Sequence, residues 1–284
     1  MVCLRELNPS DLAHRLAWWL RHRITWSPPV IRRPRTLPAL LQTLAPALRP
    51  AAEALISRYD LSGWEQGCDT QGFRESLYVL DVLSRYAGPP DVTQPALDIG
   101  CKNGCYLPGL QTWSGGRWDG VELDAYRRYW TLTTRRAHGE FIARSLPGCR
   151  YLTGNLLDLR GRYGFITWFL PFLHAAPLQV WGLPRRFLMP QTLLAHAWTL
   201  LAPGGRLFVV NQGEVEAQRQ AQLFQKAGIV AHAIGRIESP LSPFQRPRYG
   251  FLATAQQNAS PAGIDPLEWT AAPTPAGLNA SNSP

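Results

Sequence analysis

A short apolar strand that runs into a glycine-bearing turn constrains this chain more than any other feature. Residues 96–106 read ALDIGCKNGCY. In open α/β sheets such a turn follows the first strand, where glycine lets the backbone bend tightly and approach a bound ligand. Loops of this kind usually carry a second glycine where this chain has Lys102. The stretch therefore predicts an α/β sheet and leaves open whether its loop still binds a ligand.

Strand-like and helical patterns alternate along most of the chain. Helical patterns follow most of the strand-like segments, which stand at 96–99, 118–122, 150–152, 164–169 and 206–210. Such alternation predicts a parallel sheet covered by helices on both faces. Residues 230–234 and 249–253 leave no room for a long helix between them, so we expect an antiparallel pair at the sheet edge. The predicted fold is a Rossmann-like, doubly wound α/β fold with a mostly parallel seven-stranded sheet.

The N-terminal region combines a helical pattern with an excess of arginine. Residues 1–50 contain eight arginines against Glu6 and Asp11, in a chain whose formal net charge is +9. An amphipathic helix after Pro9 is indicated by the helical spacing of Leu12, Leu16, Trp19 and Leu20. We predict an arginine-rich helical cap over residues 1–72 and an α/β core over 73–255. Residues 256–284, rich in Pro, Ala, Asn and Ser, are predicted to be a disordered tail.

The basic surplus bears on partners and location. It can attract nucleic acid, an anionic membrane surface or an acidic protein. Of the 29 basic residues 27 are arginine, however, and this bias fits a general compositional preference equally well. A nucleic-acid partner therefore stays an alternative that we do not favour over a small-molecule substrate. The longest apolar patch of the N-terminus, LAWWL, is too short to span a bilayer and no signal-peptide order is present, so we expect a cytoplasmic protein.

The cysteines indicate neither a disulfide framework nor a metal site. The chain has five cysteines and no C-x-x-C pair, which predicts reduced thiols. Cys101 and Cys105 begin the C-x-x-x-C-x-x-C spacing of an iron–sulfur site, but the third position is Pro108. Cys149 and the six histidines show no spacing suited to a tetrahedral zinc site, so no metal is predicted.

Four motifs between about residues 73 and 255 carry a resemblance to a known family. In chain order they are LDIGCKNG, WDGVELD, YLTGNLLDL and LLAPGGRLFVV. Their order and spacing resemble those of class I S-adenosylmethionine-dependent methyltransferases. The resemblance implies S-adenosylmethionine as the cofactor and transfer of its methyl group to a nucleophile. A nicotinamide cofactor is disfavoured, because G-x-G-x-x-G would need glycine at 102 and a small residue at 105, where the chain has Lys102 and Cys105.

The resemblance also assigns cofactor-binding positions. The first motif implies that Asp98, Gly100 and Gly104 hold the methionine end of the cofactor. Glu122, at the end of the second predicted strand, matches the acid that accepts hydrogen bonds from the ribose hydroxyls. Asn155 matches a position, commonly Asp, that binds the adenine amino group, and Asp158 is a second candidate for that work.

Lys102 has two interpretations. A side chain at a glycine position can crowd the loop and weaken binding of the cofactor. Alternatively, the cation pairs with the carboxylate of the cofactor's methionine moiety. We favour retained binding because the other motif residues are present, and we expect Lys102→Ala to weaken the affinity.

The loop after the fourth predicted strand bears on the methyl acceptor. Its text, GFITWFLPFLHAAPL, lacks the N/D-P-P-Y/F signature of enzymes that methylate DNA bases or protein amides. His174 is the imidazole of this loop and a candidate general base toward a substrate hydroxyl; the alternative is a histidine satisfied by backbone groups. The aromatic and proline-rich segment 174–191 predicts either a lid that favours an apolar or aromatic acceptor, or a packing surface for the N-terminal helices.

The sequence as a whole predicts an S-adenosylmethionine-dependent methyltransferase with an unidentified, small or apolar acceptor. Two alternatives stay open. One is a non-catalytic, methyltransferase-like binding module. The other is a nucleic-acid methyltransferase that docks through its basic cap, for which affinity should fall steeply with added salt.

Overall fold

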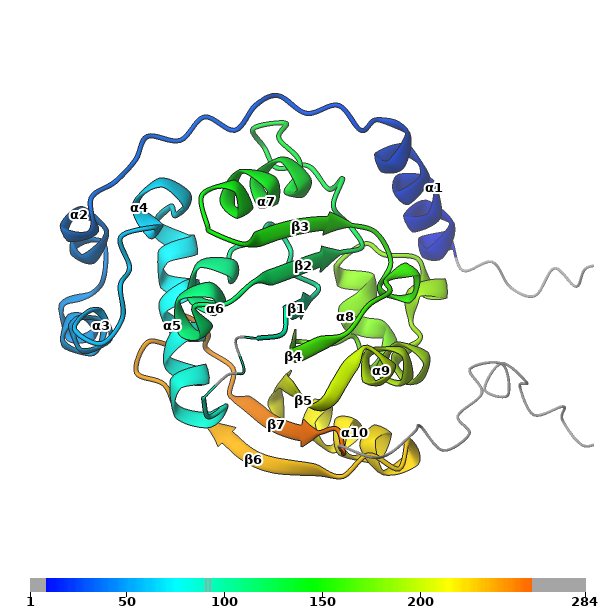
Figure 1. Cartoon of the computed structure of the whole chain (residues 1–284). Helices are drawn as coiled ribbons and strands as arrows, with labels where there is room; N and C mark the ends of the chain where they lie inside the picture. The colour runs from blue at the N-terminus through cyan, green and yellow to red at the C-terminus, as the bar shows by residue number, and fades with distance from the viewer. Residues whose placement is uncertain (1–8, 90, 92, 257–284) are drawn as a thin grey trace, which may run out of the picture.

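A seven-stranded sheet with the order β3-β2-β1-β4-β5-β7-β6 forms the centre of the protein (Figure 1). The computed structural model describes residues 9–89, 91 and 93–256. The strands are β1 (Ala96–Ile99), β2 (Trp118–Glu122), β3 (Cys149–Thr153), β4 (Tyr163–Phe169), β5 (Leu201–Gln212), β6 (Ala231–Ile237) and β7 (Arg248–Thr254). Strands β1 to β5 pair in parallel, whereas β7 is antiparallel to both β5 and β6. The predicted fold class, including the antiparallel edge pair, is confirmed.

The order of strands reverses between β1 and β4, which are neighbours in the sheet. Ligands of open α/β sheets bind beyond the carboxyl ends of strands at such a reversal, because the connecting helices diverge there. Every residue of β1, β2 and β4 is buried, as expected for strands covered on both faces. The buried strands therefore hold the first residues of the loops that follow them in place.

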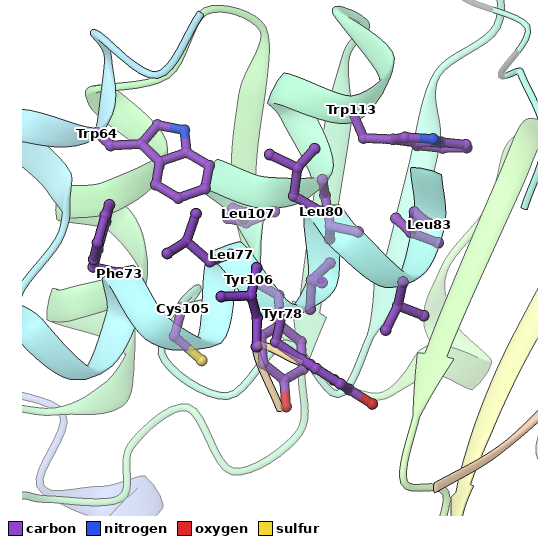
Figure 2. Packing of buried hydrophobic residues seen from close by; sticks show 14 of the residues in the cluster. Trp64, Phe73, Leu77, Tyr78, Leu80, Leu83, Cys105, Tyr106, Leu107 and Trp113 are labelled. Atoms are coloured by element: carbon purple, nitrogen blue, oxygen red, sulfur yellow. The ribbon is translucent and has the colours of Figure 1, made fainter. Parts of the chain in front are cut away.

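Helices cover both faces of the sheet. On one side lie α5 (Thr70–Tyr86), α6 (Leu107–Ser114) and α7 (Arg135–Arg144), and on the other lie α9 (Pro190–Thr199) and α10 (Gly213–Lys226). Figure 2 shows Leu77 and Leu80 of α5 close to Leu107 of α6. The two helices approach closely because Gly109 has no side chain. A Cβ at this position would lie 2.4 Å from the Ser76 carbonyl oxygen.

The region before α5 divides into two parts that pack in different places. Helices α2 (Leu37–Gln42), α3 (Arg49–Ile56) and α4 (Trp64–Gly67) pack beside α5, and Leu40 and Leu55 belong to the same buried cluster as Leu77. Helix α1 (Pro9–Arg23) lies apart from them, beyond the carboxyl ends of β2 and β3 (Figure 1). The boundary at residue 72 stays a prediction, since the second part shares its core with α5.

Helix α1 forms where the sequence predicts it, but its apolar stripe faces solvent. Leu16 and Trp19 are exposed, and the helix packs instead through Asp11, Trp18 and Arg21. Specific polar contacts fix this orientation: the Asp11 carboxylate accepts a hydrogen bond from the Arg185 backbone N–H, and Arg21 pairs with a buried aspartate of the core.

Two further expectations concern the chain's ends and its fifth strand. Strand β5 begins at Leu201, so the LAPGG segment predicted as a preceding turn belongs to an irregular first part of the strand, where Gly204 has φ +76°. The predicted tail lies outside the described residues from position 257 onward. Among the described helices, none combines the length and the apolar character that crossing a membrane requires.

Candidate functional site

A cavity of about 220 Å³ lies at the carboxyl ends of β1, β2, β4 and β5. One end is polar and is lined by Gly100, Lys102, Glu122, Arg135 and Asn155. The other end is apolar, and its walls include Trp168, Phe172, Leu178, Trp181, Leu183 and Phe187. The cavity therefore joins a glycine-bearing, charged region to a hydrophobic one.

The loop after β1 keeps the backbone path of a glycine loop although one glycine is missing. Gly100 and Gly104 have φ +74° and +76°, and Lys102 between them has φ +53°. Lysine rarely adopts this left-handed conformation, because its Cβ crowds the backbone. Two hydrogen bonds hold it there: the Lys102 N–H donates to Glu122 Oε2 at 2.8 Å, and its carbonyl accepts from the Tyr151 hydroxyl at 2.5 Å.

The side chain of Lys102 leads away from the loop toward an aromatic residue. Its Nζ lies 5.2 Å from the Tyr106 ring centroid and donates to the Tyr106 hydroxyl at 3.5 Å. Burial opposes the charge, but Tyr106, Cys105 and Glu75 together raise the pKa of the lysine above its ordinary value. Among the described residues, the hydrogen-bond partner of this ammonium is the Tyr106 hydroxyl and not a carboxylate.

Glu122 ends β2 and is buried in the polar end of the cavity. Its Oε2 accepts from Lys102 N, while Oε1 accepts from Asp124 N at 2.8 Å and from Arg135 Nη1 at 3.3 Å. Burial raises the pKa of this carboxyl, and Arg135 opposes the shift. A carboxylate has about four lone-pair sites, so the three bonds leave room for one further donor, or for two if Arg135 moves aside.

Arg135 connects the two ends of the cavity and was not singled out from the sequence. Its guanidinium bonds Glu122 and lies 4.8 Å above the Trp181 ring of the apolar end. It stands in the first turn of α7, where Thr134 caps the helix by accepting from Ala137 N. Local sequence spacing does not reveal that an arginine lies buried beside Glu122.

Asp98 is buried and does not line the cavity. Its Oδ1 accepts from the Thr167 hydroxyl at 2.8 Å, and its Oδ2 has no partner among the described residues. Burial raises the pKa of this carboxyl to about 7, although the Thr167 hydrogen bond opposes the shift. A buried oxygen without a hydrogen bond costs free energy, and this one lies at the base of the glycine loop.

Asn155 lines the cavity, whereas Asp158 does not. The Asn155 Oδ1 accepts from Leu157 N at 3.1 Å and so caps the short helix η2 (Leu156–Asp158). This turn places Asp158 in solvent. Asn155 therefore lies at the cavity and Asp158 lies away from it, and both assignments stay predictions.

The segment after β4 covers the apolar end. It contains α8 (Ala175–Val180) and η3 (Arg185–Phe187), and we refer to residues 174–189 as the lid. Leu178 and Leu183 line the cavity and also pack against Trp18 of α1. The two alternatives raised by the sequence are thus both realised, because the lid covers the cavity and is itself covered by α1.

His174 does not line the cavity, and its role as a general base stays a prediction. It precedes α8, and its Nε2 lies 3.5 Å from Glu216 Oε1. Glu216 does line the cavity, and its Oε2 accepts from Gln212 N at 3.0 Å. The sequence pointed to Glu216 only as an acid at a helix N-terminus, since its approach to His174 depends on how α10 packs.

Neither a protein-family model nor a curated protein matches the chain. Several solved structures are similar to it. One is a SAM dependent methyltransferase from Aquifex aeolicus, with 14% identity and a TM-score of 0.47 over 64% of this chain and 92% of that chain. A cyclopropane-fatty-acyl-phospholipid synthase-like protein from Lactobacillus casei ATCC 334 has 11% identity and a TM-score of 0.49 over 72% and 99%. Phosphoethanolamine N-methyltransferase 2 from Haemonchus contortus, in complex with S-adenosyl-L-methionine, has 15% identity and a TM-score of 0.43 over 63% and 52%.

Proposed function

We propose that this chain, whose strand order is that of class I S-adenosylmethionine-dependent methyltransferases, binds S-adenosylmethionine and methylates a small apolar or aromatic acceptor. The observation that carries the proposal is that one cavity has both a polar end, at the loops after β1 and β2, and an apolar end, under the lid. A polar nucleoside and a hydrophobic acceptor meet in such a cavity without crossing solvent.

The residues at the polar end suit the polar groups of the cofactor. Gly100 and Gly154 line it, and a Cβ on either would meet nothing within 4 Å, so the backbone leaves open space for a ligand. Glu122 offers an acceptor to the ribose hydroxyls, and Asn155 offers an amide to the adenine. Lys102 offers its ammonium to the carboxylate of the methionine moiety.

The bound cofactor supplies a methyl group on a positively charged sulfur. The chain's own residues orient the partners and keep water out, which are the main contributions an enzyme makes to such a transfer. Leu178 and Leu183 of the lid exclude water from the apolar end. Glu216, which lines the cavity, receives the proton of an acceptor hydroxyl or thiol, and His174 orients this carboxylate from outside the wall.

A second candidate function is a cofactor-binding module without catalysis. The observation that favours it is the crowded state of Glu122, which already accepts hydrogen bonds from Lys102, Asp124 and Arg135. His174 also stands outside the cavity. In this alternative the protein binds the cofactor and transfers nothing.

Transfer of an isotope-labelled methyl group tests the two candidates. The protein is incubated with methyl-labelled S-adenosylmethionine and a panel of apolar alcohols, phenols and thiols, and release of S-adenosylhomocysteine is followed. We expect turnover with at least one acceptor, and a loss of about a hundredfold in Glu216→Gln with cofactor affinity retained.

The matched control is Glu214→Gln, which neutralises an exposed acid on the same helix and should leave turnover unchanged. Cofactor binding without label transfer to any member of the panel would favour the binding module. Absence of cofactor binding would overturn both candidates.

A further inference from the structure

The outward face of α1 is apolar. Leu12, Leu16, Trp19 and Leu20 follow one another at helical spacing and face solvent, with exposures of 57% for Leu16 and 52% for Trp19. The opposite face of the helix already packs on the lid through Trp18. A helix that is held on one side and apolar on the other marks an interaction surface, because soluble proteins rarely expose large contiguous apolar patches.

Exposed tryptophans also lie outside the helix. Trp26 is exposed in the segment that follows α1, and Trp130 is fully exposed in the loop before α7. Arg128 ties the two segments together by donating to the carbonyls of Ile24, at 2.9 Å, and Trp26, at 2.5 Å. We refer to Leu12, Leu16, Trp19, Leu20, Trp26 and Trp130 as the outer apolar surface.

The charge around the outer apolar surface is positive. Between residues 9 and 36 the only acid is Asp11, which is buried and engaged by Arg15 and the Arg185 backbone. Arg23 is exposed and stacks over the Trp19 ring at 5.3 Å. Arg33 is also exposed. Aliphatic side chains, tryptophans and arginines without balancing acids are the composition of helices that lie in the interface of an anionic bilayer.

We infer that the outer apolar surface docks on an anionic membrane surface, with α1 in the plane of the headgroups. The leucines enter the acyl boundary, the tryptophans lie at headgroup level, and Arg23 and Arg33 contact lipid phosphates. Nucleic acid suits this face less well, because Leu12, Leu16 and Leu20 neither stack on bases nor neutralise phosphates. A second copy of the chain is opposed by the net charge of +9 on each molecule.

Docking also places the lid close to lipid, because Trp18 on the inner face of α1 contacts Leu178 and Leu183. The docking itself does not depend on the proposed methyl transfer. It concerns residues that line no part of the cavity, so the two proposals can fail separately.

Sedimentation of the full chain with lipid vesicles tests the inference. Vesicles of phosphatidylcholine with phosphatidylglycerol are compared with vesicles of phosphatidylcholine alone. We expect the wild type to bind the anionic vesicles more tightly and to be released by salt. The double variant Leu16→Gln, Trp19→Gln should lose at least about tenfold in partitioning, since both large apolar side chains leave the lipid.

The matched control is Val230→Gln, which removes an exposed apolar side chain that is not part of the outer apolar surface and should bind like the wild type. The thermal unfolding midpoint and S-adenosylhomocysteine affinity of the double variant report whether its fold and cavity are intact. Equal vesicle binding by the double variant, or no binding by the folded wild type, overturns the inference. So does a dimer that the double variant abolishes without any vesicle binding, or binding of a single-stranded RNA oligonucleotide in place of vesicles.

Discussion

The two ends of the cavity differ in how the chain builds them. The polar end comes mostly from the segments that follow β1, β2 and β3, and its residues lie within sequence motifs except for Arg135 of α7. The apolar end is assembled from β4 and the lid, and α1 packs on the lid although it precedes the lid by more than a hundred residues in sequence. The comparison teaches that a ligand loop is encoded locally, whereas the surface that selects an acceptor depends on tertiary docking.

The largest expected effect concerns the residue that couples α1 to the core. Asp124 is buried, and it pairs with Arg127 at 2.5 Å and with Arg21 of α1 at 3.1 Å. Removing the charge leaves both arginines without their partner, so Asp124→Asn should lower the free energy of unfolding by roughly 3–5 kcal/mol. Denaturant unfolding measures this, with the exposed Asp158→Asn as the control. Equal stability of the two variants would contradict a coupling of α1 to the core through this aspartate.

Asp98 gives the polar end a pH dependence of its own. Burial raises its folded-state pKa to about 7, above the value of about 3.9 in an unfolded chain. The folded protein therefore binds a proton more tightly, and its stability should fall as pH rises from about 4 to about 7 and then level off. The expected loss is about 2–4 kcal/mol.

Asp98→Asn removes the ionisation and should abolish this part of the slope. Unfolding free energies at several pH values compare the variant with the wild type, and Asp158→Asn serves as the control because its side chain is exposed. A wild-type slope that persists in Asp98→Asn would place the titrating group elsewhere.

Trp18 tests whether the apolar end can be disturbed alone. Its ring lies 4.6 Å from that of Phe187 and packs on Leu178 and Leu183. Trp18→Ala should cost about 2–3 kcal/mol of stability at this edge of the molecule and speed proteolysis of α1. Cofactor affinity should stay unchanged, because Trp18 packs on the lid and lines no part of the cavity.

The neighbouring Trp19→Ala is the matched control, since Trp19 is exposed and should be removed at little cost to stability. A loss of cofactor affinity in Trp18→Ala would mean that the two ends are not separable.

The smallest effect is the most specific to the polar end. Lys102→Gly relieves the left-handed strain and should stabilise the fold by about 1 kcal/mol. The same change removes the ammonium, so affinity for S-adenosylmethionine should fall by about tenfold. Thermal unfolding measures the change in stability and calorimetry the change in affinity. The control is Lys226→Ala, because glycine at this position would disturb α10. Tighter binding in Lys102→Gly would show that the lysine crowds the site.

The strands that position the polar end could be predicted because their determinants are adjacent in the chain. Strands β1 and β2 have the predicted bounds, and the run LDIG leads into the loop as expected. The positive φ of Lys102 could not be predicted from the local sequence. It depends on hydrogen bonds that Lys102 makes with Glu122 and Tyr151, which belong to other strands.

The composition of the apolar end could be predicted from the sequence, but the packing partners of its residues could not. Segment 174–191 has the composition of a lid, and the structure places it over the cavity. The outward direction of Leu16 and Trp19 does not follow from helical spacing, which identifies a stripe and not its partner. Likewise, His174 and Glu216 are forty-two positions apart, so only the packing of α10 brings them to 3.5 Å.

The most direct test of the account is calorimetric titration of the protein with S-adenosylmethionine and S-adenosylhomocysteine. The account predicts binding by the wild type, a loss of at least about a hundredfold in Glu122→Ala, and unchanged binding in Asp158→Ala. Glu122→Gln, which retains the size of the side chain, separates loss of the carboxylate from loss of packing. A folded wild type that binds neither compound would contradict the account and show that the loop around Lys102 keeps its shape without its ligand.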